Sequence, residues 1–144
     1  MSITIRAAVP SDAPAIQALS AQLTAGAITD GVAERIQDII TQGRDGLFVA
    51  ETEGYVCGYI QVAPYDATYR PRGAEVMSLV VDDARRRAGA GTALLARAEQ
   101  WARERGAAYA HLYSGAERAG AHTFYETRGY TLRKMSKSFI KNLT

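Results

Sequence analysis

A turn built from arginine and glycine is the clearest candidate for chemistry in this sequence. It consists of Arg86, Arg87, Ala88, Gly89, Ala90, Gly91 and Thr92. An apolar run at residues 76–81 precedes the turn, and an amphipathic helical pattern at residues 93–105 follows it. A glycine-rich turn at a helix N-terminus presents free backbone N–H groups and the positive end of the helix dipole to an anion. Because phosphate is the usual anion at such a site, the turn predicts a phosphate-bearing cofactor.

The turn matches neither of two common phosphate-binding motifs. It lacks the third glycine of a dinucleotide-binding fingerprint, and no lysine stands at the position of a P-loop lysine. Glycine pairs are also common in tight strand-to-helix turns, where the neighbouring arginines would be solvated. The turn by itself therefore leaves open both a phosphate site and a purely structural turn.

The elements that must position this turn follow from the hydrophobic periodicity. We expect strands at residues 3–8, 47–51, 55–62, 75–81, 108–113 and 130–139. We expect helices at about residues 12–23, 31–42, 91–105 and 116–128. Ser11 or Asp12 is the expected N-cap of the first helix, and Gly43 the stop of the second. Residues 52–54 form a hairpin turn and residues 64–73 a loop.

The order of these elements, β-α-α-β-β-β-α-β-α-β, indicates the fold class. The front half has antiparallel hairpin character. The strand at 75–81, the following helix and the strand at 108–113 form a right-handed parallel βαβ unit. Because the strand at 75–81 is apolar at nearly every position toward its end, it is expected to be central in the sheet. We therefore expect an α+β fold, a mixed sheet with helices on both faces.

The composition limits the number of domains, the disulfides and the kinds of partner that we expect. A chain of 144 residues with 47% apolar and 22% charged residues fits one globular domain, residues 1–144. Its single cysteine, Cys57, excludes an internal disulfide and is expected in the core. A net charge of +2 does not indicate a nucleic-acid partner. Because the N-terminus lacks a signal-peptide pattern and no apolar run could span a bilayer, we expect a cytoplasmic protein without a membrane partner.

Three motifs together resemble those of the GNAT N-acetyltransferase family. The first is the turn itself, Arg86-x-x-Gly89-x-Gly91. The second is Arg118-x-x-Ala121-His122-x-Phe124-Tyr125-Glu126, followed by Gly129-Tyr130. The third, at the start of the chain, is Ile5-Arg6-x-x-x-Pro10-Ser11-Asp12. The resemblance covers nearly the whole chain in the right order.

The resemblance implies a cofactor and the residues that hold it. It implies a mostly antiparallel mixed sheet of about six or seven strands, with acetyl-CoA as acetyl donor and no metal. The pyrophosphate would lie on the backbone of the turn from Arg86 to Thr92, and the pantetheine arm would pair with Leu79, Val80 and Val81. Arg118 stands where many members have an asparagine that contacts the cofactor arm, so its role stays open.

The resemblance also implies catalytic roles. Tyr125 would donate a proton to the leaving sulfur, although the helical face that it shares with Ala121 and Phe124 would by itself indicate packing. Glu75 is the candidate base, acting directly or through water. Family members commonly carry an acidic residue two positions later, where this chain has Met77, and positions 75 and 77 point to the same face of the strand. A shift of the role to Glu75 and a reaction with no dedicated base both stay open. A backbone N–H near Leu79 would stabilise the oxyanion. For His111, and for His122, structural and functional roles both stay open.

The function implied is acetyl-CoA-dependent transfer of an acetyl group to a primary amine by direct attack in a ternary complex. The acceptor is expected to be a small molecule, and a homodimer is left open. The loop residues Tyr65, Tyr69, Arg70 and Arg72 suit an acidic or aromatic amine. The alternatives are an acetyl-CoA-binding regulator without turnover, an acetyltransferase for protein N-termini or lysines, and a nucleic-acid-binding domain that uses Arg85, Arg86 and Arg87.

Overall fold

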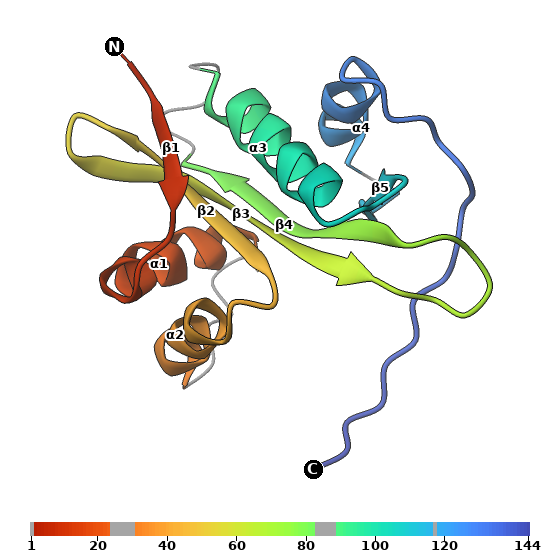
Figure 1. Ribbon diagram of the computed structural model, residues 1–144, viewed down its shortest axis with the longest axis horizontal. Helices are drawn as coiled ribbons and strands as arrows, with labels where there is room; N and C mark the ends of the chain where they lie inside the picture. The colour runs from red at the N-terminus through yellow and green to blue at the C-terminus, as the bar shows by residue number, and fades with distance from the viewer. Residues whose placement is uncertain (1, 24–30, 83–88, 117) are drawn as a thin grey trace. The chain divides into compact units, whose positions relative to one another are not determined.

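The computed structural model describes residues 2–23, 31–82, 89–116 and 118–144 (Figure 1). The chain divides into two compact units, Met1–Leu112 and Tyr113–Thr144. In the described parts of the chain, no helix combines the length and the apolar character needed to cross a membrane.

The first unit is built on one sheet with the strand order β1-β2-β3-β4-β5. The strands are β1 (Thr4–Ala7), β2 (Gly46–Thr52), β3 (Tyr55–Tyr65), β4 (Gly73–Val81) and β5 (Ala110–His111). The first four strands pair antiparallel, and β4 pairs parallel with β5. The expected mixed, mostly antiparallel sheet and its parallel βαβ unit are confirmed. The described residues form five strands rather than six or seven.

Helices cover both faces of this sheet, as expected (Figure 1). A short 3-10 turn, η1 (Pro10–Asp12), leads into α1 (Ala13–Leu23), which lies with α2 (Val32–Gln42) on one face. The helix α3 (Ala90–Glu104) packs on the other face against β2, β3 and β4. The predicted end of α2 is confirmed, because Gly43 has a φ of +66° and donates its N–H to the Ile39 carbonyl.

The predicted N-cap of the first helix is wrong. Asp12 directly precedes α1, which begins at Ala13, but the hydrogen bonds of its carboxylate go to residues before the helix and not to the first turn of α1. The Asp12 carboxylate instead accepts a hydrogen bond from the Val9 N–H, with an N–O distance of 2.8 Å. It also accepts two from the Arg6 guanidinium, at 2.8 and 3.0 Å. Asp12 therefore closes the turn before the helix and ties it to β1.

Asp12 gives a pH-dependent contribution to stability. Its hydrogen bonds with Arg6 hold the pKa of the carboxyl below its usual value, although burial opposes this. The contribution is therefore present at neutral pH and is lost as the pH falls through that lowered pKa. We expect Asp12→Asn to reduce the free energy of unfolding by about 2 kcal/mol at pH 7, and by less near pH 3, as measured by urea denaturation.

Asp66→Asn is the matched control, because Asp66 forms an exposed ion pair with Arg72. Exposed pairs contribute little, so the control should change the free energy of unfolding by no more than about 0.5 kcal/mol. An equal loss for Asp12→Asn at both pH values would contradict the assignment of the effect to carboxylate ionisation.

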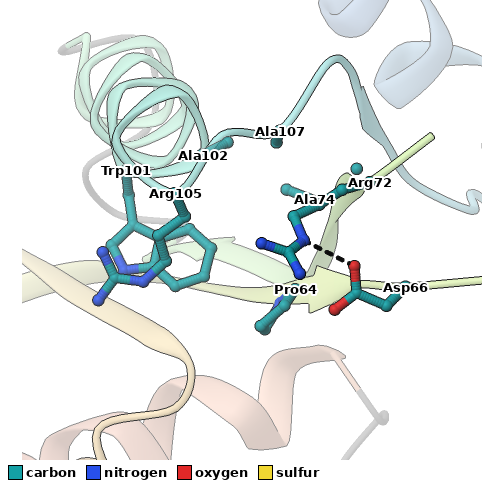
Figure 2. Close-up of a pocket in the computed structure, with 9 residues that line it drawn as sticks. Pro64, Asp66, Arg72, Ala74, Trp101, Ala102, Arg105 and Ala107 are labelled. Carbon is teal, nitrogen blue, oxygen red and sulfur yellow. Dashed lines mark hydrogen bonds and ion pairs between the residues drawn. The ribbon is translucent and has the colours of Figure 1, made fainter.

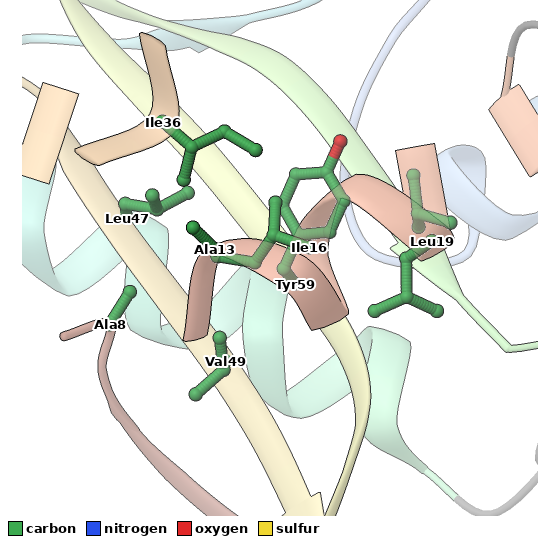
Figure 3. Packing of buried hydrophobic residues seen from close by; sticks show 9 residues of the cluster. Ala8, Ala13, Ile16, Leu19, Ile36, Leu47, Val49 and Tyr59 are labelled. Atoms are coloured by element: carbon green, nitrogen blue, oxygen red, sulfur yellow. The ribbon is translucent and has the colours of Figure 1, made fainter. Parts of the chain in front are cut away.

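The core between the sheet and the first two helices is apolar (Figure 3). Its members are Ala8, Ala13, Ile16, Leu19, Ile36, Leu47, Val49, Tyr59 and Val80. Figure 3 shows Ile16 and Leu19 of α1 beside the ring of Tyr59 on β3. The buried Tyr59 hydroxyl is hydrogen-bonded to the Ser20 hydroxyl, at 2.8 Å. Cys57 is buried, as expected for a core thiol.

The second unit contains one helix, α4 (Ala119–Glu126), in its described part. The predicted helix at 116–128 is therefore confirmed in type but is shorter. The predicted strand at 130–139 is wrong, because residues 130–144 are in neither helix nor strand. A strand forms only where a neighbouring strand takes up its backbone hydrogen bonds, and the described residues of this unit contain no other strand.

Candidate functional site

The centre of the candidate site is on β4, which contains a bulge. The pairing with β3 steps from Gln61↔Ser78 to Val62↔Val76 and passes over Met77. Met77 is 53% exposed. A bulge interrupts the alternation of side chains between the two faces of a strand. The expectation that Glu75 and Met77 share a face assumed an unbroken strand and does not apply here.

Glu75 and His111 are brought together by the parallel pairing of β4 with β5. They are register partners, and a hydrogen bond of 3.0 Å joins Glu75 Oε1 to His111 Nε2. The side chains are 24% and 12% exposed. When the carboxylate is ionised it can only accept, so this hydrogen bond fixes a proton on Nε2. The sequence analysis considered the two residues separately, and the pairing of β4 with β5 brings them together as one hydrogen-bonded pair.

Two tyrosines surround the imidazole. The ring centroid of Tyr65 lies 4.3 Å from that of His111, and the ring of Tyr109 approaches edge-on at 5.9 Å. Tyr109 also fills the space beside Gly73, where a Cβ atom would lie 2.3 Å from the ring. Sequence reasoning missed Tyr109. Its position two residues before His111 on a predicted strand was the available signal, because residues i and i+2 share a face.

Both arginines of the predicted loop at residues 64–73 interact with other side chains of the same chain. The guanidinium of Arg70 lies 4.1 Å from the centroid of the Tyr109 ring. Arg72 donates to the Asp66 carboxylate at 2.8 Å. Tyr69 is 76% exposed, and its hydroxyl is hydrogen-bonded to that of Tyr65 at 3.1 Å. These contacts hold the two arginines in place and leave Tyr69 the most accessible of the four loop residues that the sequence singled out.

Beyond Glu75, one edge of β4 has no strand beside it among the described residues. Leu79, Val80 and Val81 pair with Ile60, Tyr59 and Gly58 of β3 on one side. On the other side, β5 pairs only with Ala74 and Glu75. The end of β4 therefore has the open backbone edge that pairing with an amide-bearing ligand requires.

The glycine turn is described from Gly89 onward, and Arg86, Arg87 and Ala88 lie outside the described residues. Gly89 has a φ of +89°, directly before the first residue of α3. Among the described residues, no atom lies within 4 Å of the place a Cβ would take there, so the backbone conformation explains the glycine. Gly91 and Thr92 lie in the first turn of α3. The helix therefore begins at the predicted turn.

Tyr125 lies on α4 in the second unit. Its ring packs edge-on against Phe124 and Tyr130, with centroid distances of 5.2 and 5.8 Å. Burial raises the pKa of the Tyr125 phenol, and the positive charge of Arg118 opposes that shift. A raised pKa keeps the phenol protonated at neutral pH, as a proton donor requires. His122 is hydrogen-bonded to the Gly115 carbonyl at 2.8 Å, a structural contact within the same unit.

A cavity of about 290 Å³ lies at the C-terminal end of α3 (Figure 2). Its lining includes the Trp101 and Arg105 side chains and the ion pair of Arg72 with Asp66. Gly89, at the other end of α3, does not line it, and neither do Glu75 and His111. Across the residues that the structure describes, no group of three His, Cys, Asp or Glu side chains could hold a metal ion.

Comparison with known protein sequences gives two matches. A model of the Acetyltransferase (GNAT) family matches residues 14–130. An uncharacterized N-acetyltransferase from Methanocaldococcus jannaschii is 30% identical over 105 residues. That match covers 72% of this chain and 46% of the relative, so the chain spans about half of the relative's length.

Solved structures share the fold over nearly the full chain. A transcriptional regulator from Bacillus halodurans C-125 has a TM-score of 0.85 at 23% identity, covering 97% of this chain and 100% of its own. An aminoglycoside acetyltransferase from an uncultured soil metagenomic sample, in complex with sisomicin, has a TM-score of 0.82 at 22% identity, covering 99% and 97%. The enzyme AAC(6')-Iy, in complex with a bisubstrate analog, has a TM-score of 0.88 at 16% identity, covering 99% of both chains.

Proposed function

The chain belongs to the GNAT acetyltransferase family, and from this premise we propose that it transfers an acetyl group from acetyl-CoA to a small-molecule primary amine. The observation that carries this proposal is the arrangement along β4. A carboxylate paired with an imidazole lies at Glu75, an open strand edge follows it, and a helix N-terminus comes next in the chain at Gly89. We propose that residues 1–144 act as one acyl-CoA-binding domain, in keeping with a family match that runs through both units.

The residues proposed to hold the cofactor fit its chemistry. The pyrophosphate would be bound by backbone N–H groups of the turn from Arg86 to Thr92, where the α3 dipole favours an anion. The edge of Leu79, Val80 and Val81 would accept the amide-bearing pantetheine arm. When bound, acetyl-CoA supplies the activated acetyl group. A structure of AAC(6')-Iy with a CoA-containing bisubstrate analog supports this choice of cofactor for the fold.

Glu75 is proposed as the base in a ternary complex. It accepts the proton that the amine loses, directly or through one water, as the amine nitrogen bonds to the acetyl carbon. His111 holds the carboxylate in place through the 3.0 Å hydrogen bond. A backbone N–H near Leu79 is proposed to stabilise the oxyanion. When the carbon–sulfur bond breaks, Tyr125 gives its phenol proton to the departing thiolate, and Arg118 is proposed to contact the cofactor.

The proposal is tested by thiol release from acetyl-CoA over a panel of acceptors. The panel holds an aminoglycoside, a polyamine, free amino acids and a peptide with a free N-terminus. We expect turnover with at least one small-molecule amine. Turnover with the peptide alone would instead support a protein acetyltransferase. Binding of acetyl-CoA without turnover on any amine would support a regulator, the second candidate, since a Bacillus halodurans structure described as a transcriptional regulator shares the fold.

Tyr125→Phe should lower kcat by about 100-fold, in the range for loss of a general acid. The dissociation constant of acetyl-CoA should change by less than about twofold, because the ring and its packing remain. Tyr130→Phe is the matched control, since this neighbouring ring packs against Tyr125 and has no proposed role in proton transfer. Steady-state kinetics and calorimetric titration measure the two quantities. An unchanged kcat for Tyr125→Phe would remove Tyr125 as the acid.

A further inference from the structure

The cavity at the C-terminal end of α3 has the size and the lining of a site for a small ligand. Its volume of about 290 Å³ is near the lower limit for pockets that hold small molecules. Its apolar walls include Pro64, Ala74, Trp101, Ala102 and Ala107. Its charged side chains are two arginines and one aspartate. The cavity therefore offers apolar surface for the body of a ligand and a few polar groups to orient it.

The two arginines that line the cavity keep terminal guanidinium nitrogens available. Arg72 donates to Asp66 through Nε at 2.8 Å, and among the described residues nothing accepts a hydrogen bond from its two terminal nitrogens. Figure 2 shows this guanidinium between Asp66 on one side and Trp101 with Arg105 on the other. Arg105 Cζ lies 4.4 Å from the centroid of the Trp101 ring, and no carboxylate in the described part of the chain pairs with it. Two guanidinium groups and one carboxylate give the lining a positive charge, which favours an anion.

Backbone hydrogen bonds hold the walls of the cavity together. The Ala108 N–H donates to the Arg72 carbonyl at 2.8 Å, and the Ala74 N–H donates to the Tyr109 carbonyl at 2.9 Å. These bonds join the loop at residues 66–72 and the start of β4 to the segment that follows α3. A site whose walls are fixed before the ligand arrives loses less entropy on binding.

The cavity lies on the face of the sheet opposite to Glu75 and His111. Pro64 of β3 and Ala74 of β4 are register partners, and both line it. Glu75 follows Ala74 in β4 without a bulge between them, so its side chain points to the other face. His111 is hydrogen-bonded to Glu75 on that other face. A ligand in the cavity is therefore not the amine that Glu75 is proposed to activate.

We propose that this cavity binds a small carboxylate with an apolar body of about the size of a benzene ring, the size that its volume admits. The carboxylate lies between the guanidinium groups of Arg72 and Arg105, because a planar guanidinium can give a carboxylate two parallel hydrogen bonds. The apolar body lies against the walls around Trp101, which free phosphate would leave without a contact. The site does not depend on the proposed acetyl transfer, since none of the residues proposed for that reaction lines the cavity.

Trp101 gives a direct readout of binding, because it lines the cavity and is the only tryptophan of the chain. Titration with benzoate should change its fluorescence and give a dissociation constant below about 1 mM. Benzamide has the same ring without the charge, and inorganic phosphate has the charge without an apolar body. Each should bind at least about tenfold more weakly than benzoate. No binding of benzoate, or binding of benzamide or phosphate as tight as that of benzoate, overturns the proposal.

Variants of the two arginines locate the site. Arg72→Gln and Arg105→Gln should each weaken benzoate binding by at least about tenfold, in the range for loss of a hydrogen bond to a charged group. Calorimetric titration measures this, because Arg105 also contacts the fluorescent ring. Arg103→Gln is the matched control, since Arg103 is exposed on the same helix and does not line the cavity. Its benzoate affinity should stay within about twofold of wild type.

A competition experiment separates this site from the proposed cofactor site. Saturating CoA should leave the affinity for benzoate unchanged, because the start of α3 at Gly89 does not line the cavity. Displacement of benzoate by CoA, or a wild-type affinity for benzoate in both Arg72→Gln and Arg105→Gln, overturns the proposal. Neither result bears on whether the chain transfers acetyl groups, which the release of thiol measures separately.

Discussion

Glu75→Gln should lower kcat by about 100-fold, in the range for loss of a general base, and should leave the dissociation constant of acetyl-CoA within about twofold. The amide oxygen can still accept the hydrogen bond from His111 Nε2, so the pair keeps its geometry. What the amide cannot do is take a proton from the attacking amine. The expected result is therefore a loss of turnover without a loss of cofactor binding, measured by thiol release and calorimetric titration.

Two further variants sharpen this result. Glu51→Gln is the matched control, because Glu51 is another hydrogen-bonded carboxylate of the same sheet, with Arg6 as its partner. Its kcat should stay within about twofold of wild type. His111→Gln should lower kcat less than Glu75→Gln does, and the double variant should be no worse than Glu75→Gln, because coupled residues do not act additively. A wild-type kcat for Glu75→Gln would show that the reaction needs no dedicated base.

Gly89→Glu should weaken acetyl-CoA binding by at least about 100-fold, which corresponds to about 2.7 kcal/mol. The φ of +89° at Gly89 is unfavourable for any residue with a Cβ, so the substitution distorts the backbone at the start of α3. The added carboxylate also repels a phosphate at this helix N-terminus. Calorimetric titration with CoA measures the change directly.

Gly106→Glu provides the matched control. Gly106 follows the other end of α3, has a φ of +78° and, like Gly89, has no atom of the described residues within 4 Å of the Cβ position. Both variants should lose similar stability in thermal denaturation, but only Gly89→Glu should lose CoA affinity. If both variants bind CoA equally well, the pyrophosphate does not bind at the glycine turn.

Local signals in the sequence predicted the helices well. Gly43 and Gly89 mark helix boundaries because each adopts a positive φ that side chains with a Cβ avoid. The buried face of α3, with Leu94 and Trp101, follows from helical periodicity alone. Asp12 was misassigned because its carboxylate could either cap the first helix or close the turn before it. Only the tertiary contact with Arg6 selects the second role.

Features that depend on pairing between distant segments were predicted less well. Glu75 and His111 were both recognised, but their hydrogen bond depends on the register of β4 with β5, which no local pattern encodes. The bulge at Met77 depends on how β3 and β4 align, so the alternation rule failed there. The pattern at residues 130–139 has strand propensity, but propensity alone cannot supply a neighbouring strand.

The contact between Gly73 and the Tyr109 ring has a consequence for engineering new acceptor specificity. A side chain at position 73 would collide with that ring, so the two positions cannot be varied independently. Any larger residue at position 73 alone would require the Tyr109 ring to shift. Pairing each larger residue at 73 with a smaller one at 109 keeps the total volume, and it also opens space beside His111. A design that enlarges residue 73 should therefore first replace Tyr109 by a smaller residue.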